Sequence, residues 1–238
     1  MKWIGVFALA TIFFAKEGVG QEREKGLSAE ELADGWELLF DGKTTQGWHV
    51  YNKGAVASAW KVKDGVLYCD SEDYDSVRGD LVTDRTFRNF DFRFDWNISK
   101  EGNSGVFFNV QEAEENPTAW TTGPEFQLLE KSHFDQSQPL KQAGALFGLH
   151  PRLNSVQDRS GGEWNQARIV QQNGVVEFYL NGVLTVRQDL NSLEFKQKIA
   201  QSNFKTFPHF GQSIEGRLAL QDWSKGIAFR SMKIKVLP

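Results

Sequence analysis

The sequence predicts an all-β fold, an antiparallel β-sandwich, on three observations. From Phe90 to Ile98, apolar residues alternate with Asp, Arg and Asn, a period of two that is typical of a strand with one buried and one polar face. Two Asn-Gly pairs, at 173–174 and 181–182, suit the type I′ turns of tight hairpins. Short strand-like runs recur at near-regular spacing with few helical stretches, which favours two antiparallel sheets.

Residues 1–20 are predicted to be a secretory signal peptide. Lys2 precedes an unbroken apolar run, residues 3–15, which is too short for a helix across a bilayer core of about 30 Å but suits a signal sequence. The small residues 18–20 predict cleavage before Gln21, and the alternatives are cleavage at the end of the apolar run or retention as a membrane anchor. The protein is therefore expected to be exported, periplasmic or extracellular, with no membrane span after cleavage.

The rest of the chain is predicted to begin with a short helix and to continue as one β domain. Residues 21–35 are charged and polar, and Ser28 to Glu31 read S-A-E-E, the capping-box pattern of a helix N-terminus. Residues 36–238 contain no linker, internal repeat or low-complexity tract, so a single domain is expected there.

Strand signals follow one another through this domain. A turn at 102–105 is expected to lead from the strand at 90–98 into a strand at 106–110. Further strands are predicted at 125–130, 143–149, 166–171, 175–180, 183–188, 217–221 and 227–236. The stretch 192–205 is expected to form a helical turn and an irregular connection. Two long polar loops, 111–123 and 150–165, have the length of binding loops.

Composition and motifs argue against several classes of function. The formal net charge is −4 and no basic stripe interleaves with aromatic residues, so no nucleic-acid partner is expected. Cys69 is the single cysteine, which rules out an internal disulfide. The four His show no zinc-site spacing; no metal or cofactor is expected, with a loop Ca²⁺ ion as the open alternative. The absence of a G-x-S-x-G elbow, a P-loop and a dinucleotide fingerprint argues against serine hydrolases, NTPases and Rossmann enzymes.

Polar residues recur on the predicted strands, among them Glu125 and Gln127 in the stretch G-P-E-F-Q-L-L-E. If a strand follows Pro124, these two side chains share one face, while Phe126 and Leu128 point to the other. Each polar residue alone fits a solvated strand face, but their recurrence favours a sugar site on one sheet. The eight Trp and 19 Phe fit a protein that stacks rings on sugars, although most Phe are expected in the core.

The order of motifs along the chain resembles that of one family. The motifs are W-E-L-L-F-D-G-K-T-T-Q-G-W (36–48), W-K-V-K-D-G-V-L-Y (60–68), G-D-L-V-T (79–83), G-N-S-G-V-F-F (102–108), G-P-E-F-Q-L-L (123–129), A-G-A-L-F-G-L (143–149), G-E-W-N-Q-A-R-I-V (162–170), Y-L-N-G-V-L (179–184), G-R-L-A-L-Q-D (216–222) and F-R-S-M-K-I (229–234). In this order they resemble the 3-keto-disaccharide hydrolase domain family over residues 36–237.

The resemblance implies a concanavalin A-like jelly roll that acts on glycosides whose sugar carries a ketone at C3. The ketone acidifies the C2 proton, so a general base can remove it and the enolate can expel the C1 substituent by β-elimination, after which water adds back. Such an enzyme needs a base, donors for the enolate oxygen and a proton source for the leaving group.

Carried over position by position, the resemblance implies a set of site residues. Glu125 is the best candidate for the base or acid, and Arg230 could stabilise an oxyanion or pair with a carboxylate. The implied catalytic residues are Glu125, His150, Asp222 and Arg230, and the implied substrate-binding residues are Asn103, Ser104, Asn109, Gln127, Arg168, Gln221 and Trp223. Glu163 and Trp164 have either a site role or a purely structural one.

Two departures from the family pattern bear on the site. Members usually read L-Q-D-H-G where this chain reads L-Q-D-W-S, so Trp223 replaces a common His. Many members have Tyr-Asp where this chain has Phe147-Gly148, and His150 is the expected compensating base. The alternative function is a non-catalytic glycan-binding module, or an accessory domain on the same fold. No oligomeric state is predicted.

Overall fold

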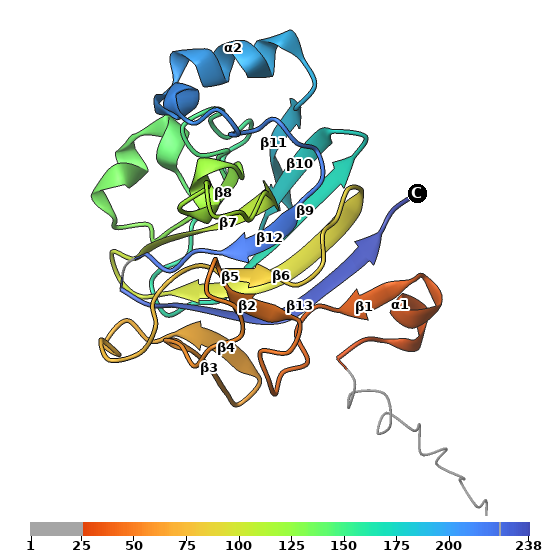
Figure 1. Ribbon diagram of the computed structural model, residues 1–238, viewed down its shortest axis with the longest axis vertical. Coiled ribbons are helices and arrows are strands. Elements are labelled where there is room, and N and C mark those ends of the chain that lie inside the picture. Colours follow the sequence, from red (N-terminus) through yellow and green to blue (C-terminus); the bar gives the residue numbers. More distant parts are fainter. Residues whose placement is uncertain (1–25, 224) are drawn as a thin grey trace, which may run out of the picture.

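The computed structural model describes residues 26–223 and 225–238, which form two antiparallel β-sheets packed face to face (Figure 1). The large sheet has the strand order β11-β10-β9-β6-β13-β4-β3, with β1 also paired to β13, and the small sheet has the order β2-β5-β12-β7-β8. This confirms the all-β jelly-roll class. The predicted signal peptide lies outside the described residues.

The strands and helices have the following bounds. The large sheet contains β1 (Trp36–Leu38), β3 (Trp60–Lys63), β4 (Val66–Cys69), β6 (Phe90–Ile98), β9 (Asn165–Gln172), β10 (Val175–Leu180), β11 (Val183–Asp189) and β13 (Ile227–Val236). The small sheet contains β2 (Trp48–Val50), β5 (Leu81–Thr83), β7 (Asn103–Val110), β8 (Glu125–Leu129) and β12 (Arg217–Leu220). The helices are α1 (Ala29–Ala33), α2 (Leu193–Gln201) and the 3₁₀ turns η2 (Ala119–Thr121), η3 (Phe134–Ser137), η4 (Pro139–Lys141) and η5 (Asn203–Thr206).

Aromatic side chains from both sheets fill the space between them. Phe94 of β6 meets Phe126 of β8 edge to face, with 6.2 Å between the ring centroids. Phe126 also packs on Phe178 of β10 at 4.7 Å, and its side chain is fully buried. Because side chains alternate along a strand, this packing turns Glu125 and Gln127 of β8 to the outer face of the small sheet, as predicted.

The predicted hairpins are confirmed. Asn173 and Gly174 have φ values of 52° and 82°, and Asn181 and Gly182 have 49° and 84°, the left-handed pair that a type I′ turn requires. Asp64 and Gly65, at 50° and 77°, form a third hairpin between β3 and β4 that was not predicted. The strands before residue 84 were missed because three or four residues are too few to show an alternation.

Three further expectations are corrected or extended. Residues 143–149 do not form a strand: they form turns beside β8, because Gly144 and Gly148 adopt φ values of 79° and 70°. The turn expected at 102–105 lies earlier, since the Gly102 amide donates to the Ser99 carbonyl at 2.9 Å and β7 begins at Asn103. The helix in the 192–205 stretch is longer than expected, spans nine residues and lies at the top of Figure 1.

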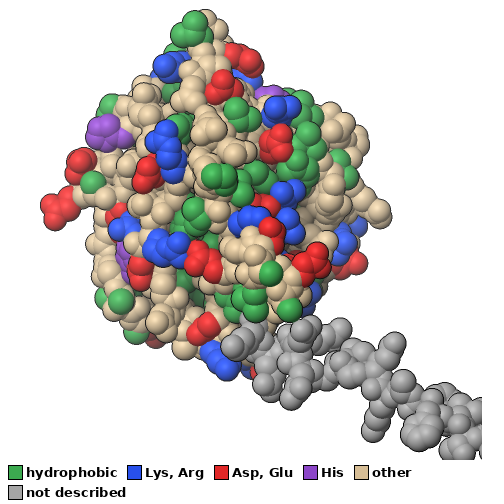
Figure 2. Space-filling model, turned by 90° about the vertical axis from the view of Figure 1, so that its right-hand side faces the viewer, with side chains coloured by type: hydrophobic (Ala, Val, Ile, Leu, Met, Phe, Trp, Pro, Cys, Tyr) green, Lys and Arg blue, Asp and Glu red, His purple; other side chains and the backbone are tan. Residues whose placement is uncertain are grey.

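The N-terminal capping box is confirmed. The Glu31 amide donates to Ser28 Oγ and the Ser28 amide to Glu31 Oε2, both at 3.1 Å. Acidic and basic side chains are interspersed over the face of the molecule shown in Figure 2. Within the described ranges, no helix has the length and apolar character needed to cross a membrane.

Candidate active site

A row of polar positions crosses the outer face of the small sheet. Leu81 of β5 pairs with Leu220 of β12, which places the preceding Asp80 opposite the following Gln221. The Gln221 amide donates to the Gly105 carbonyl at 2.9 Å, and Gly105 pairs with Gln127. Asp80, Gln221, Gly105 and Gln127, termed here the polar row, therefore lie side by side on neighbouring strands.

The carboxyl group of Glu125 lies over Gly105 in this row. A Cβ atom built on Gly105 would fall 2.0 Å from Glu125 Oε1, so only glycine leaves room for the carboxyl group at this position. Glu125 is 7% exposed, and its carboxyl group has no hydrogen-bond partner among residues 26–223 and 225–238. Burial, reinforced by the nearby Asp80, raises the pKa of Glu125 well above its ordinary value. Burial thus favours the protonated form of this carboxyl group.

Asp80 is the second carboxyl group of the site, and the sequence reasoning missed it. The Asp222 amide donates to Asp80 Oδ1 at 3.0 Å, and the backbone amide of Ala119 in η2 also lowers the pKa of this carboxyl group. Burial and the charge of Asp222 outweigh these hydrogen bonds and raise the pKa of Asp80 to about 7. The sequence did contain Asp80 in a motif of the family pattern, G-D-L-V-T. The strand that follows has only three residues, so its pairing with other strands could not be predicted from the sequence.

Asp222 itself is held in an ion pair. Its carboxylate accepts hydrogen bonds from Arg78 Nε at 2.9 Å and from Arg78 Nη2, and from the Gly79 amide at 3.0 Å. The Cys69 thiol donates to it as well, at 3.2 Å. With 4% of the side chain exposed, Asp222 does not fit its predicted role as a free catalytic carboxylate. It holds the segment that carries Asp80.

Side-chain amides flank the two carboxyl groups. Gln127 Nε2 donates to Asn103 Oδ1 at 3.0 Å, which fixes both amides on the outer face. Gln221 Oε1 is buried and has no partner in the described part of the chain. Buried polar atoms are nearly always paired, so an unpaired amide oxygen beside an unpaired carboxyl group indicates a place that a polar ligand fills. Ser104 points to the inner face, where its Oγ donates to the Gln221 carbonyl at 2.9 Å.

The two predicted arginines lie on the other side of the sandwich. Arg168 of β9 donates to both oxygens of Asp91, at 2.8 and 2.7 Å, and Arg230 of β13 donates to Asp95 at 3.1 Å. Ala167 and Ile169 beside Arg168, and Phe229 before Arg230, are buried in the core, so both guanidinium groups project from the outer face of the large sheet. Arg230 also lies 4.0 Å above the ring of Trp164. The structure therefore corrects their placement: neither reaches the polar row, and Trp164 has a structural contact.

Asn109 and His150 also lie apart from the polar row. Asn109 adopts a φ of 57° where β7 is irregular, and its Nδ2 donates to Gln171 Oε1 at 2.7 Å inside the sandwich. His150 Nδ1 is 2.6 Å from the Pro151 carbonyl. The partners of both side chains therefore lie outside the polar row.

Trp223 follows Asp222 directly and is 66% exposed. Its ring is therefore not part of the core. The replacement of the family's usual His thus leaves a large aromatic surface next to the segment that holds Asp80.

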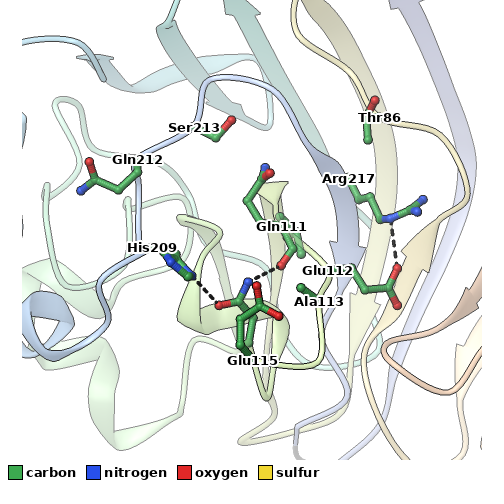
Figure 3. Close-up of a pocket in the computed structure, with 11 residues that line it drawn as sticks. Thr86, Gln111, Glu112, Ala113, Glu115, His209, Gln212, Ser213 and Arg217 are labelled. Carbon is green, nitrogen blue, oxygen red and sulfur yellow. Dashed lines mark hydrogen bonds and ion pairs between the residues drawn. The ribbon is translucent and has the colours of Figure 1, made fainter.

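A separate cavity of about 560 Å³ lies further along the same sheet face (Figure 3). Arg217 of β12 and Glu112 form an ion pair in its wall at 3.0 Å, and Gln111 and His209 line it as well. The cavity is separated from the polar row because Phe107, Ala219 and Ala119 pack together between them. The polar row and this cavity are therefore two separate places on the sheet face. The part of the chain that the structure describes holds no group of three His, Cys, Asp or Glu arranged for a metal ion.

The fold and the site define a class: a carbohydrate-active β-sandwich with an acidic site on one sheet face. The sequence profile of the 3-keto-alpha-glucoside-1,2-lyase-like domain matches residues 35–235. The chain belongs to this family, which confirms the resemblance.

The relatives agree with this family. The chain is 29% identical over 247 aligned residues to a 3-keto-disaccharide hydrolase of Bacteroides thetaiotaomicron, and the alignment covers 90% of this chain and 85% of the relative. A solved structure from Parabacteroides distasonis, provisionally described as a glycosyl hydrolase, is 31% identical with a TM-score of 0.82, covering 89% of this chain and 98% of that one. A second structure of the same description and organism, at 21% identity and a TM-score of 0.64, covers 85% and 99% and shares the fold.

Proposed function

We propose that the protein cleaves 3-keto-glycosides, including 3-keto-disaccharides, by C2 proton abstraction, β-elimination and hydration. One observation carries the proposal: the unpartnered, buried carboxyl group of Glu125 lies beside a second carboxyl group and an unpaired amide oxygen. Family membership and the named activity of the Bacteroides relative support the substrate class.

The reaction needs only groups that can hold and move protons. A base removes the C2 proton, and the electron pair of that C–H bond forms the enolate of the C3 ketone. The enolate re-forms the ketone as a C1–C2 double bond develops and the C1–O bond breaks, and the leaving oxygen takes up a proton. Water then adds to C1 while a proton returns to C2, so the net reaction is hydrolysis. Two carboxyl groups supply every proton step, and the amides of the polar row are placed to bind sugar hydroxyls.

Glycan binding without cleavage is the second candidate function, and the exposed ring of Trp223 favours it. An exposed tryptophan that follows the site directly offers a flat surface on which a sugar ring can stack. If the protein instead cleaves 3-keto-glycosides, the Trp223 ring would bind the leaving sugar.

The test compares oxidised and unoxidised substrates. Purified protein is incubated with a 3-keto-disaccharide and with the same disaccharide lacking the ketone, and release of the leaving sugar and binding heat are both measured. Release from the 3-keto compound alone is expected. Release from both would indicate an ordinary glycosidase that uses the Asp80 and Glu125 pair directly, and binding without release would support the glycan-binding function.

The place of action is proposed to be outside the cytoplasm. The charged and apolar start of the chain supports export. Export also suits an enzyme whose oxidised substrate is produced by a separate oxidising enzyme.

Gly105→Ala is expected to lower cleavage by about 10²-fold, the cost of a misplaced reacting group. The new methyl group would overlap Glu125 Oε1 and displace the carboxyl group, which should also destabilise the fold by about 1–3 kcal/mol. Urea unfolding of Gly105→Ala, Glu125→Ala and the double variant tests whether the overlap with Glu125 causes the destabilisation. The destabilisation should vanish in the Glu125→Ala background, and an equal loss in both backgrounds would show that Gly105 does not act through Glu125.

A further inference from the structure

The two carboxyl groups of the site differ in surroundings, and this difference divides the proton transfers between them. We propose that Asp80 is the base that removes the C2 proton and that Glu125 is the acid that protonates the leaving oxygen. The inference rests on the proposed function, and it adds a catalytic residue and a direction of proton flow.

The working form of the pair carries a single proton. Asp80 acts electrostatically on Glu125, and two like charges in a poorly hydrated site oppose each other's ionisation. In this form one group is a carboxylate and the other is a carboxylic acid. The elimination needs both, because the carboxylate removes the C2 proton and the acid protonates the leaving oxygen.

The hydrogen bonds decide which group is ionised. Asp80 accepts a hydrogen bond from the backbone amide of Asp222, and amide N–H groups stabilise a carboxylate rather than a carboxylic acid. Glu125 has no donor within the described residues, and it is almost fully buried. The proton therefore resides on Glu125. Burial raises the pKa of both groups, that of Asp80 to about 7 and that of Glu125 well above its ordinary value.

The other charged groups near Asp80 do not reverse this assignment. Asp222 is paired with Arg78, and its charge raises the pKa of Asp80 by less than the hydrogen bond from its amide lowers it. Burial, with a contribution from Asp80, raises the pKa of Tyr51 to about 12, so its phenol stays neutral. Burial and then Asp222 raise the pKa of the Cys69 thiol, so it is neutral as well. The titratable groups that interact electrostatically with Asp80 are thus Asp222, Tyr51 and Glu125.

The proton count closes over a full cycle. Asp80 gains the C2 proton as the enolate forms, and Glu125 loses its proton to the leaving oxygen as the C1–O bond breaks. Glu125, now ionised, takes a proton from the water that adds to C1, and Asp80 returns its proton to C2. Both groups regain their starting states. No histidine takes part, so Trp223 can occupy the position of the family's usual His without removing a proton carrier.

Hydrogen exchange at C2 separates the two roles. Wild type, Asp80→Asn and Glu125→Gln are incubated in D₂O with a 3-keto-disaccharide, and deuterium at C2 and release of the leaving sugar are followed together. Glu125→Gln should lose release by about 10²- to 10⁴-fold while C2 exchange persists. Asp80→Asn should lose both. Asp95→Asn and Glu177→Gln, the same two changes on the large sheet, serve as matched controls.

A second substrate and a pH series complete the test. A 3-keto-glucoside with a nitrophenolate leaving group departs without protonation, so Glu125→Gln should cleave it nearly as well as wild type does. The wild-type kcat/KM should rise with pH through about 7 as Asp80 ionises. Exchange that is lost in Glu125→Gln but kept in Asp80→Asn, or lost equally in both, would overturn the division of roles. Wild type that neither exchanges nor cleaves would instead refute the proposed function.

Discussion

Replacing Glu125 by glutamine is expected to lower the rate of 3-keto-disaccharide cleavage by about 10²- to 10⁴-fold and to stabilise the fold at neutral pH. Glutamine keeps the shape of the side chain but has no proton to transfer. The stability gain arises because the folded state raises the pKa of Glu125. As pH rises above the ordinary glutamate range, the unfolded chain ionises at this position while the folded chain does not, and the wild type loses stability.

The pH dependence makes this prediction specific. Steady-state kinetics give the activity, and thermal unfolding at pH 4 and pH 8 gives the stability. The melting temperature of Glu125→Gln should exceed that of wild type at the higher pH and match it at the lower pH. Glu177→Gln, on the outer face of the large sheet, should change neither quantity. Undiminished cleavage, or the same stability difference at both pH values, would contradict the prediction.

Asp222→Ala is expected to destabilise the fold by about 3 kcal/mol, close to the cost of breaking a buried ion pair. The substitution removes the partner of Arg78 and leaves the Gly79 amide and the Cys69 thiol without their acceptor. Urea unfolding measures the loss. Activity should fall as well, because the segment whose amide holds Asp80 is no longer anchored.

A matched pair on the large sheet provides the control. Asp95→Ala breaks the more exposed pair with Arg230, whose side chain is 42% exposed, and such pairs contribute at most about 1 kcal/mol. Adding Arg78→Met to Asp222→Leu should recover most of the stability, since apolar replacements of a buried pair are often neutral. A double variant as unstable as Asp222→Ala would show that the loss has another cause.

Local pattern was enough to predict the face on which Glu125 lies. Alternation at 125–129 and the burial of Phe126 depend on neighbouring residues alone, and the Asn-Gly turns depend on two residues each. The partners of Glu125 depend on register between strands that are far apart in the sequence. Asp80 directly precedes a three-residue strand, β5, and could not be aligned in advance. Arg168 and Arg230 were expected in the sugar site, but local alternation does not say which sheet a residue belongs to, and both lie on the large sheet.

The back-to-back placement of Phe126 and Glu125 on β8 has a consequence for protein engineering. The rings that hold Phe126 come from the large sheet, so a change at Phe94 or Phe178 alters how β8 sits and therefore where the Glu125 carboxyl group lies. Selection for new leaving groups can then be directed at core positions that touch no substrate. Libraries at these positions would shift the Glu125 carboxyl group by smaller amounts than substitutions within the site itself would.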